Sequence, residues 1–551
     1  MIIPCSAGEE RWKMCFMTSR RGRNAEGSLS IRDNIFKEWI MAVTSFAAID
    51  IGSYNVTMEI FEITKKNGLK SLTTVRQRLE LGRDTYNDGM VSPEILRELT
   101  RILKDYSRIM KEYDTRSYRA CAKTALREAR NFLLVREHVR NKTGINIEIL
   151  SNSEQRFMAY KSIASRGEEF QKFIGKGTAI IDVSGGSIQI SLFDKETLVT
   201  AQNLKLGLLR ISSRLSKILN ETTHPDALID EFIRKDIMNF KRMHLKDRNI
   251  DTIILVGDYY TNIIFQNKTD MNKIETREEF MIWYDHIIRK TPGEVASELG
   301  VGMEVADAVI PMAVLYRRLI EVLGANTIWL PGIQLTDGLA YDFATKAKLI
   351  RTQHDFDKDI VMAAKHMAKR YGGNKAHTEK LVEIADAIFK AVRKESVLGP
   401  RDRLLLKVAC YLNDCGKYIS LVNVAECSYS IINSTEIIGL SDTERIIIAD
   451  VVKYHTLPFE FYGENNEGLT EFDFLRVAQL TAILRTANSL DQSYLQKVQE
   501  MRVTAKDGVL KIDVTVKQDF TLEKGLFAST VDFFEDMFDM KPVLKIRRSI
   551  A

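Results

Sequence analysis

Two segments of the chain share one pattern of apolar and polar positions. Each begins with an apolar run that ends at an aspartate, continues through a short Gly/Ser turn, and finishes with alternating polarity. The segments are residues 46–63, FAAIDIGSYNVTMEIFEI, and residues 178–194, TAIIDVSGGSIQISLFD. Each predicts a strand, a polar turn and a second strand. A unit of this kind that recurs in one chain indicates an internal duplication.

Between the two hairpins, the pattern predicts strands that alternate with helices. Residues 92–113 read as a helix, with Ser92 as its N-cap and Pro93 at its first position. The other predicted elements are a strand over 118–122, a helix over 124–141, a strand over 147–150 and a helix over 154–165. This alternation favours an α/β fold.

From about residue 355 the pattern changes to helices without intervening strands. The predicted helices cover residues 360–371, 378–394, 401–413, 441–454 and 473–491. Near the end, VTAKDGVLKIDV predicts two strands joined by a turn at Asp507 and Gly508. We therefore expect an all-α domain followed by a small α+β C-terminal cap.

A chain of 551 residues is too long for one hydrophobic core, so several domains are expected. Residues 1–40 hold a basic, polar stretch without a clear period, which predicts a disordered extension, and Met41 is an alternative start. The predicted divisions are a first lobe over 41–170, a second lobe over 171–345, the helical domain over 346–500 and the cap over 501–551.

The composition is that of an ordinary globular protein, with 45% hydrophobic and 28% charged residues. The net charge of +5 is small against 79 basic and 74 acidic residues, so it identifies no DNA or membrane partner. Any anion-binding site must therefore be local.

The six cysteines form no CxxC pair, which predicts reduced thiols in a cytoplasmic protein. No apolar run reaches the roughly 18 residues that a membrane-spanning helix needs. A soft-metal site at Cys410, Cys415 and Cys427 is an alternative, but two helical cysteines five residues apart share a face poorly.

The paired turns carry the candidate chemistry. A Gly/Ser turn between strands exposes backbone N–H groups that bind phosphate oxygens. The aspartates beside the turns, Asp50 and Asp182, suit Mg²⁺, which takes one or two carboxylates together with water and phosphate oxygens. One such turn would more often be an ordinary hairpin, whereas two matched copies favour a site for phosphate and metal.

These segments resemble the exopolyphosphatase and guanosine pentaphosphate phosphatase (Ppx/GppA) family, within the actin/hexokinase-like (ASKHA) superfamily. AAIDIGSYN is similar to the family's loop DxGSNS, and CAKTALREARN is similar to ATSALRxAxN. IEILSNSEQR is similar to IExISGxEEAR, IIDVSGGSIQ to IDIGGGSTE, and LKLGLLRI to LPLGxxRL. The resemblance implies duplicated ribonuclease H-type lobes with a cleft between them.

The resemblance also implies an activity, in which terminal phosphate is released from inorganic polyphosphate or from pppGpp with the help of Mg²⁺. A glutamate of the EEAR segment activates water, while positioning and charge neutralisation supply most of the catalysis. Asp50 and Asp182 become the expected metal ligands. The expected phosphate-binding residues are Gly52, Ser53, Arg127, Gly185, Gly186, Ser187 and Gln189.

The departures from the family pattern put ordinary hydrolysis in doubt. Gln155 stands where the catalytic glutamate is expected, and a neutral amide cannot serve as a general base. Glu154, one position earlier, points about 100° away on a helix. Gln189 replaces the glutamate of the second loop, Ser184 and Tyr54 also differ, and VGDYYTN, residues 256–262, lacks the family's glycine pair.

The helical domain resembles the HD-type domain of the longer family members, in a degenerate form. An active HD site binds metal through histidine nitrogens and aspartate oxygens. The replaced positions are Asn413, Val424 and Glu426, and the surviving ones are His377, Asp414 and Asp491. We expect this domain to be structural, extending the polyphosphate channel or supporting a homodimer.

Three functional hypotheses follow. The first is an exopolyphosphatase-like hydrolase. The second is a catalytically weakened regulatory protein that binds polyphosphate or guanosine tetra- or pentaphosphate, and Gln155 and Gln189 favour it. The third, a kinase-like phosphotransferase, has no sugar-binding signature in its support.

Overall fold

The computed structural model describes residues 44–195, 197–219, 221–256, 272–352, 354–463 and 469–548. From Thr44 onward the chain forms one compact unit. The predicted extension over residues 1–40 and most of the VGDYYTN segment lie outside the described residues. Among the residues that are described, no helix combines the length and the apolar character needed to cross a membrane.

The first sheet begins with an antiparallel meander and continues with two parallel strands. Its order is β3-β2-β1-β4-β5, formed by β1 (Thr44–Ile51), β2 (Asn55–Thr64), β3 (Gly68–Arg78), β4 (Ser117–Ala122) and β5 (Ile147–Ile149). The helices that accompany it are α2 (Leu81–Asp88), α3 (Pro93–Glu112), α4 (Thr124–Glu128) and α5 (Phe132–Thr143). Ser92 caps α3 as predicted, since its side chain accepts a hydrogen bond from the Ile95 amide.

The single helix predicted over 124–141 is wrong, because the chain breaks between α4 and α5. Asn131 accepts a hydrogen bond from the Val91 amide at 3.0 Å and donates one to the Val91 carbonyl at 2.9 Å. The Arg130 amide donates to the Gly89 carbonyl at 2.9 Å. These contacts with a distant segment hold the break in a non-helical conformation.

The second sheet repeats the first. Its order is β10-β11-β9-β6-β7-β8, formed by β6 (Thr178–Val183), β7 (Ile188–Asp194), β8 (Thr197–Leu204), β9 (Thr252–Val256), β10 (Lys273–Thr276) and β11 (Thr327–Leu330). From β8 to β11 the strands follow the order and directions of the first sheet. The predicted duplication is therefore confirmed, with β10 as an added edge strand.

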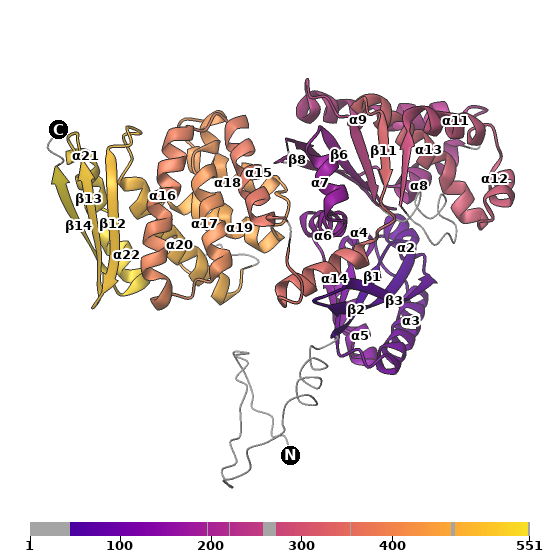
Figure 1. The fold of residues 1–551 in the computed structure, drawn as a ribbon, viewed down its shortest axis with the longest axis horizontal. Helices are drawn as coiled ribbons and strands as arrows, with labels where there is room; N and C mark the ends of the chain where they lie inside the picture. The colour runs from indigo at the N-terminus through magenta and orange to yellow at the C-terminus, as the bar shows by residue number, and fades with distance from the viewer. Residues whose placement is uncertain are drawn as a thin grey trace, which may run out of the picture. The chain divides into compact units, whose positions relative to one another are not determined.

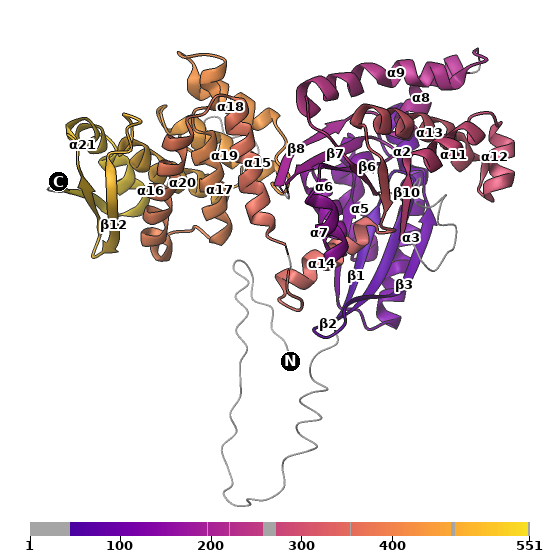
Figure 2. The same ribbon diagram turned by 45° about the horizontal axis from the view of Figure 1, so that its top comes forward.

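Helices cover one face of the second sheet and share a hydrophobic cluster with it (Figure 2). They are α8 (Leu208–Leu219), α9 (Pro225–Phe240), α11 (Arg277–Ile287), α12 (Pro292–Leu299) and α13 (Met303–Leu323), and a π-helical turn at Lys241–Leu245 extends α9. The burial of branched apolar side chains from both layers stabilises this lobe.

Two helices connect the sheets. The helix α6 (Asn152–Ala164) begins two residues before the predicted start, because Ser151 and Glu154 form a reciprocal capping box. Helix α14 (Leu335–Lys346) follows the second sheet but packs against α6 and β1 of the first (Figure 1). A further helix, α7 (Glu168–Ile174), lies between α6 and β6 in the sequence. Side chains from both sheets share one hydrophobic cluster, which includes Phe46, Phe193 and Trp329.

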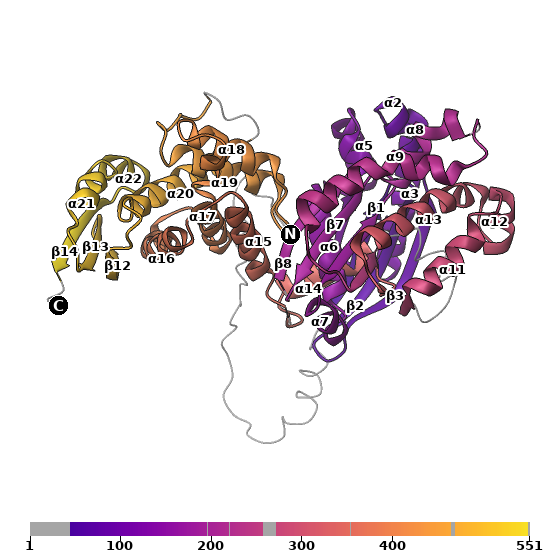
Figure 3. The ribbon, with the colours of Figure 1, turned by 90° about the horizontal axis from the view of Figure 1, so that it is seen from above.

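The rest of the chain is helical and ends in a small sheet (Figure 3). Its main helices are α15 (Phe356–Arg370), α16 (Lys375–Val392), α17 (Pro400–Leu412), α18 (Val424–Ser434), α19 (Asp442–Tyr454) and α20 (Glu471–Ser489), with short 3₁₀ turns at Arg393–Glu395 and Cys415–Tyr418. The C-terminal elements are β12 (Val498–Lys506), β13 (Val509–Val516), α21 (Thr521–Ala528), α22 (Val531–Phe538) and β14 (Lys541–Arg548).

The predicted turn between the last hairpin strands is confirmed, with Asp507 at φ 51° and Gly508 at φ 71°. Strand β14, which pairs in parallel with β13, was not predicted. One hydrophobic cluster contains side chains of the helices and of this sheet, including Ile388, Leu484 and Ile512. The helical segment and the C-terminal sheet therefore fold around a common core.

Candidate phosphate-binding site

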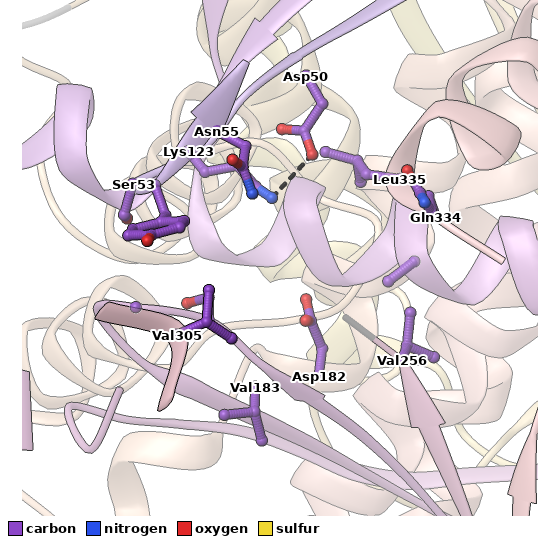
Figure 4. A pocket seen from close by; sticks show the side chains of 14 residues that line it. Asp50, Ser53, Asn55, Lys123, Asp182, Val183, Val256, Val305, Gln334 and Leu335 are labelled. Atoms are coloured by element: carbon purple, nitrogen blue, oxygen red, sulfur yellow. Dashed lines mark hydrogen bonds and ion pairs between the residues drawn. The ribbon is translucent and has the colours of Figure 1, made fainter. Parts of the chain in front are cut away.

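The two Gly/Ser turns face each other across a small cavity. We define the first loop as residues 50–55 and the second loop as residues 182–189. A Cβ atom placed on Gly185 would lie 3.1 Å from the Cβ of Ser53, so the loops are in direct contact. Both loops line a cavity of about 90 Å³. Figure 4 shows Asp50 and Asp182 pointing into it from opposite sides.

Within the part of the chain that the structure describes, the second loop leaves two amide groups without backbone acceptors, because the carbonyl groups of the same two peptides are bound elsewhere. Of Gly185 and Gly186, Gly185 lines the cavity and Gly186 does not. The carbonyl of Ser184 accepts a hydrogen bond from the Leu208 amide, and that of Gly185 accepts one from the Arg210 amide, each at 3.1 Å. In a trans peptide the N–H points opposite to the C=O, so the Gly185 and Gly186 amides point away from α8. Among the described residues, neither amide has a backbone acceptor. Such a concave amide cluster suits an anion.

The first loop offers fewer amides. The Gly52 amide donates to the Asn55 carbonyl at 2.9 Å, so it closes the turn, whereas the Ser53 amide has no backbone acceptor in the described part of the chain. The Ser53 hydroxyl lies 2.9 Å from the Tyr86 hydroxyl. Of the predicted first-loop residues, Ser53 is therefore better placed than Gly52 to bind a ligand.

Close packing fixes the position of the second loop. A Cβ atom on Gly207 would lie 2.2 Å from backbone atoms of Gly186 and Ser187, so α8 begins against the loop itself. A Cβ atom on Gly186 would lie 2.3 Å from the Tyr86 hydroxyl. Ser187 is buried, and its amide donates to the Ser184 hydroxyl at 3.2 Å, which places it in the turn rather than at the cavity.

Asp50 forms an ion pair that sequence reasoning missed. The Lys123 ammonium donates to Asp50 Oδ2 at 2.8 Å, and both residues line the cavity (Figure 4). Lys123 directly follows β4, which runs parallel to β1. The ends of parallel strands meet at one edge of a sheet. The position of Lys123 directly after the predicted strand 118–122 could therefore have indicated that it lies near Asp50.

Gln155 lies beside the second loop, as its place in the family segment implies. The side chain is fully buried, and its Nε2 donates to Asp182 Oδ2 at 3.3 Å. Its Oε1 has no hydrogen-bond partner among the described residues. The amide is thus held by Asp182, and Gln155, like Gln189, is absent from the cavity lining.

Gln189 and Glu154 lie outside the cavity lining. Gln189 pairs with Asp182 across β6 and β7 and is buried, and within the described ranges neither of its amide atoms has a hydrogen-bond partner. Glu154 accepts a hydrogen bond from the Ser151 amide at 2.9 Å and lines a different cavity, of about 920 Å³. Glu154 therefore caps its own helix and does not face Asp182.

Arg127 braces the chain behind the loops. Its guanidinium donates to the Leu150 carbonyl, to the Asn152 side chain and, at 3.1 Å, to the Thr124 hydroxyl. Burial lowers the pKa of this guanidinium. Arg127 is absent from the cavity lining, so the predicted phosphate clamp is not formed in this arrangement.

A second pair that sequence reasoning missed joins the two lobes at the loops. Arg210 donates to the Gly186 carbonyl at 3.0 Å and to Glu128 at 2.6 Å, and its guanidinium lies 4.9 Å from the centre of the Tyr86 ring. Burial raises the pKa of Tyr86 to about 12, so this hydroxyl stays protonated at neutral pH. Arg210 and Glu128 lie in the LKLGLLRI and CAKTALREARN segments, but nothing in either segment predicts that they pair.

The donor set does not favour a tightly held cation at the first loop. A divalent ion bonded to Asp50 Oδ2 would compete with the Lys123 ammonium for that oxygen, and Asp182 already receives the Gln155 amide. Within the described ranges, no group of three or more His, Cys, Asp or Glu side chains could hold a metal ion. Mg²⁺ at Asp50 and Asp182 therefore stays a prediction from the resemblance.

The three residues that the resemblance to an HD-type domain marks as surviving metal ligands contact other protein groups. His377 is buried with its Nδ1 2.8 Å from Asp491 Oδ2, and the Tyr494 ring stacks on it at 3.8 Å. The Lys417 ammonium contacts Asp414 at 2.8 Å and the Tyr494 hydroxyl at 2.7 Å. An ammonium and an aromatic ring thus contact two of these three predicted positions, Asp414 and His377.

Comparison with known proteins gives a consistent assignment. Residues 60–347 match the Ppx/GppA phosphatase family, and residues 361–532 match Ppx/GppA phosphatase domain III. A guanosine-5'-triphosphate,3'-diphosphate pyrophosphatase of Vibrio atlanticus is 18% identical over 461 residues, which is 80% of this chain and 86% of that protein. A bifunctional 3-dehydroquinate synthase/phosphatase of Fusobacterium nucleatum is 21% identical over 237 residues, 41% of this chain and only 34% of that protein.

Two solved structures are also similar. A Ppx/GppA family member of Aquifex aeolicus aligns with a TM-score of 0.48 and 20% identity over 57% of this chain and 99% of that chain. An exopolyphosphatase of Cytophaga hutchinsonii aligns with a TM-score of 0.49 and 14% identity over 56% of this chain and 100% of that chain. The family matches cover most of the described residues, so the chain belongs to the Ppx/GppA phosphatase family.

Proposed function

We propose that this protein binds the end of a phosphate chain between its two loops and hydrolyses the terminal phosphoanhydride bond. The observation that carries the proposal is the pair of loops, because Ser53 and Gly185, whose amides have no backbone acceptor among the described residues, line one cavity with the two aspartates. Inorganic polyphosphate and the triphosphate end of pppGpp are the proposed substrates. The names of the pyrophosphatase and exopolyphosphatase relatives support this substrate class.

The chemistry needs no carboxylate at position 155. Phosphoryl transfer passes through a loose transition state, in which a positioned water and stabilised phosphoryl oxygens provide most of the catalysis. The Gln155 amide positions Asp182 through its hydrogen bond, Asp182 orients the attacking water, and the Ser53 and Gly185 amides hold the terminal oxygens. The water oxygen bonds to the terminal phosphorus, the bond to the next phosphate oxygen breaks with its electron pair, and Asp182 accepts the proton of the water.

A second function is favoured by one specific observation. Gln155 carries a neutral amide where the family pattern has a base, and an amide does not remove a proton from water. A protein with this change binds a phosphate chain, hydrolyses it slowly or not at all, and reports its presence to a partner. We further propose that the helical segment is an HD-like domain that lengthens the binding surface or supports a homodimer.

Phosphate release from long-chain polyphosphate and from pppGpp, with and without Mg²⁺, separates the two functions. The hydrolase proposal predicts steady turnover by the wild-type protein, which is lost in Gln155→Ala. The regulatory alternative predicts binding without turnover, and phosphate release only in Gln155→Glu. Absence of both binding and turnover would refute both functions.

A further inference from the structure

We propose that Lys123 is the built-in cation of the first loop, so that phosphate-chain binding does not depend on a divalent ion at Asp50. The inference rests on the proposed function of the loops and assigns a binding role to a residue of the CAKTALREARN segment that was not a predicted site residue. Its ligand is the outermost phosphoryl groups of a phosphate chain, inorganic or nucleotide-linked.

The position of the ammonium is set by rigid elements. Lys123 is the N-cap of α4 and follows β4, and its amide donates to the Ile51 carbonyl at 3.2 Å. A Cβ atom on Gly52 would lie 3.6 Å from Lys123 Cε and 3.7 Å from Lys123 Nζ, so the side chain runs along the first loop. The Lys123 side chain is 12% exposed and that of Asp50 is 7% exposed. The ammonium is thus held at the cavity and not displayed on the outer surface.

The Lys123 ammonium offsets part of the negative charge of the cavity. The charged residues among its described lining are Asp50, Asp182 and Lys123, which sum to one negative charge. Without Lys123, two carboxylates would face a polyanionic ligand and repel it. An ammonium has three donors, so it can contact a carboxylate and phosphate oxygens together, as phosphate-binding lysines do.

At Asp50 Oδ2 the Lys123 ammonium competes with a metal ion. Mg²⁺ binds a carboxylate oxygen at about 2.0–2.1 Å. The ammonium already lies 2.8 Å from Asp50 Oδ2, so the two cations compete for that oxygen and repel each other. Removal of the Lys123 charge therefore takes away the cation that competes with a divalent ion at Asp50 Oδ2, and phosphate binding then depends on that ion.

The test measures the affinity for polyphosphate of defined length, before appreciable hydrolysis, in excess EDTA and in Mg²⁺. The wild-type protein is expected to bind with dissociation constants within about threefold of each other in the two buffers. Lys123→Met is expected to bind about 10- to 100-fold more weakly in EDTA, the loss of a charge-assisted contact, and to regain affinity in Mg²⁺. Lys123→Arg keeps the charge, and the exposed Lys104→Met in α3 is the matched control.

The outcomes distinguish this inference from the proposed function. Wild-type binding in Mg²⁺ that is lost in EDTA would leave the proposed function standing and overturn the role of Lys123. Equal affinities of wild type and Lys123→Met in EDTA would also overturn it. No binding by the wild type in either buffer would refute the proposed function and the inference together. The comparison of buffers on the wild type holds even if a variant fails to fold.

Discussion

Gly207→Ala tests whether the shape of the second loop matters for ligand binding. The added methyl group would lie 2.2 Å from the Gly186 carbonyl carbon and the Ser187 nitrogen, and 2.4 Å from the Gly185 carbonyl carbon. All three are backbone atoms, so no side chain can rotate away. Gly207 has no positive φ, and the steric contact is therefore the whole of the perturbation.

The size of the effect follows from these distances. Carbon atoms pack at about 3.5–4.0 Å, so the loop and the start of α8 must separate by roughly 1 Å or more. Overpacking of this kind costs about 1–3 kcal/mol of folding free energy. A displacement of about 1 Å in a positioning group can cost about 100-fold in reactivity. We therefore expect a modest loss of stability and a large loss of phosphate-chain hydrolysis.

The assay pairs denaturant unfolding with polyphosphate binding and phosphate release. Gly293→Ala is the matched control, since a Cβ atom there meets nothing within 4 Å. This control should change the unfolding free energy by less than about 1 kcal/mol and leave binding and phosphate release unchanged. A folded Gly207→Ala protein with wild-type affinity and wild-type phosphate release would refute the role given to the second loop.

Three further changes have defined outcomes. Asp182→Ala should abolish phosphate release, and full activity in this variant would contradict its role at the cavity. Gly338→Ala places a Cβ atom 2.1 Å from the Met158 carbonyl oxygen, so it should lower thermal stability by about 1–3 kcal/mol, measured by calorimetry, unless α14 and α6 can separate freely. Burial raises the pKa of Asp450 to about 6, so the folded state binds its proton more tightly than the unfolded state. Stability is then lost as pH rises from about 4 to 6, and Asp450→Asn should remove this loss in unfolding curves, whereas a parallel pH profile would contradict it.

The hairpins and their duplication could be predicted because strand and turn signals are local. Alternating polarity marks a strand, and Gly/Ser turns mark its ends, so the order of elements followed from short windows of sequence. The cap of α3 at Ser92 and the turn at Asp507 and Gly508 were found for the same reason.

The features that were missed depend on contacts between distant segments. The break between α4 and α5 is held by Val91, some forty residues earlier. The return of α14 onto the first sheet has no signal in its own residues. Lys123 and Arg210 gain their roles only from where the chain brings them, beside Asp50 and Gly186.

The positions of the two loops could be predicted from the sequence better than the contacts of the individual site residues. Asp50 and Asp182 converge because a duplicated strand order places both at equivalent strand ends. Arg127 and Glu154 were assigned from their positions in motifs. In the structure, Arg127 donates a hydrogen bond to Thr124, and Glu154 caps its own helix. A motif determines which residue follows a strand, whereas tertiary packing determines which other residue that side chain contacts.

A crystal structure with imidotriphosphate, whose bridging nitrogens resist hydrolysis, tests the central claim most directly. We expect the terminal phosphoryl group in the cavity between the loops, within hydrogen-bond distance of the Ser53 and Gly185 amides. A triphosphate bound instead in the larger cavity lined by Glu154 and Arg401, with the loops unoccupied, would contradict it.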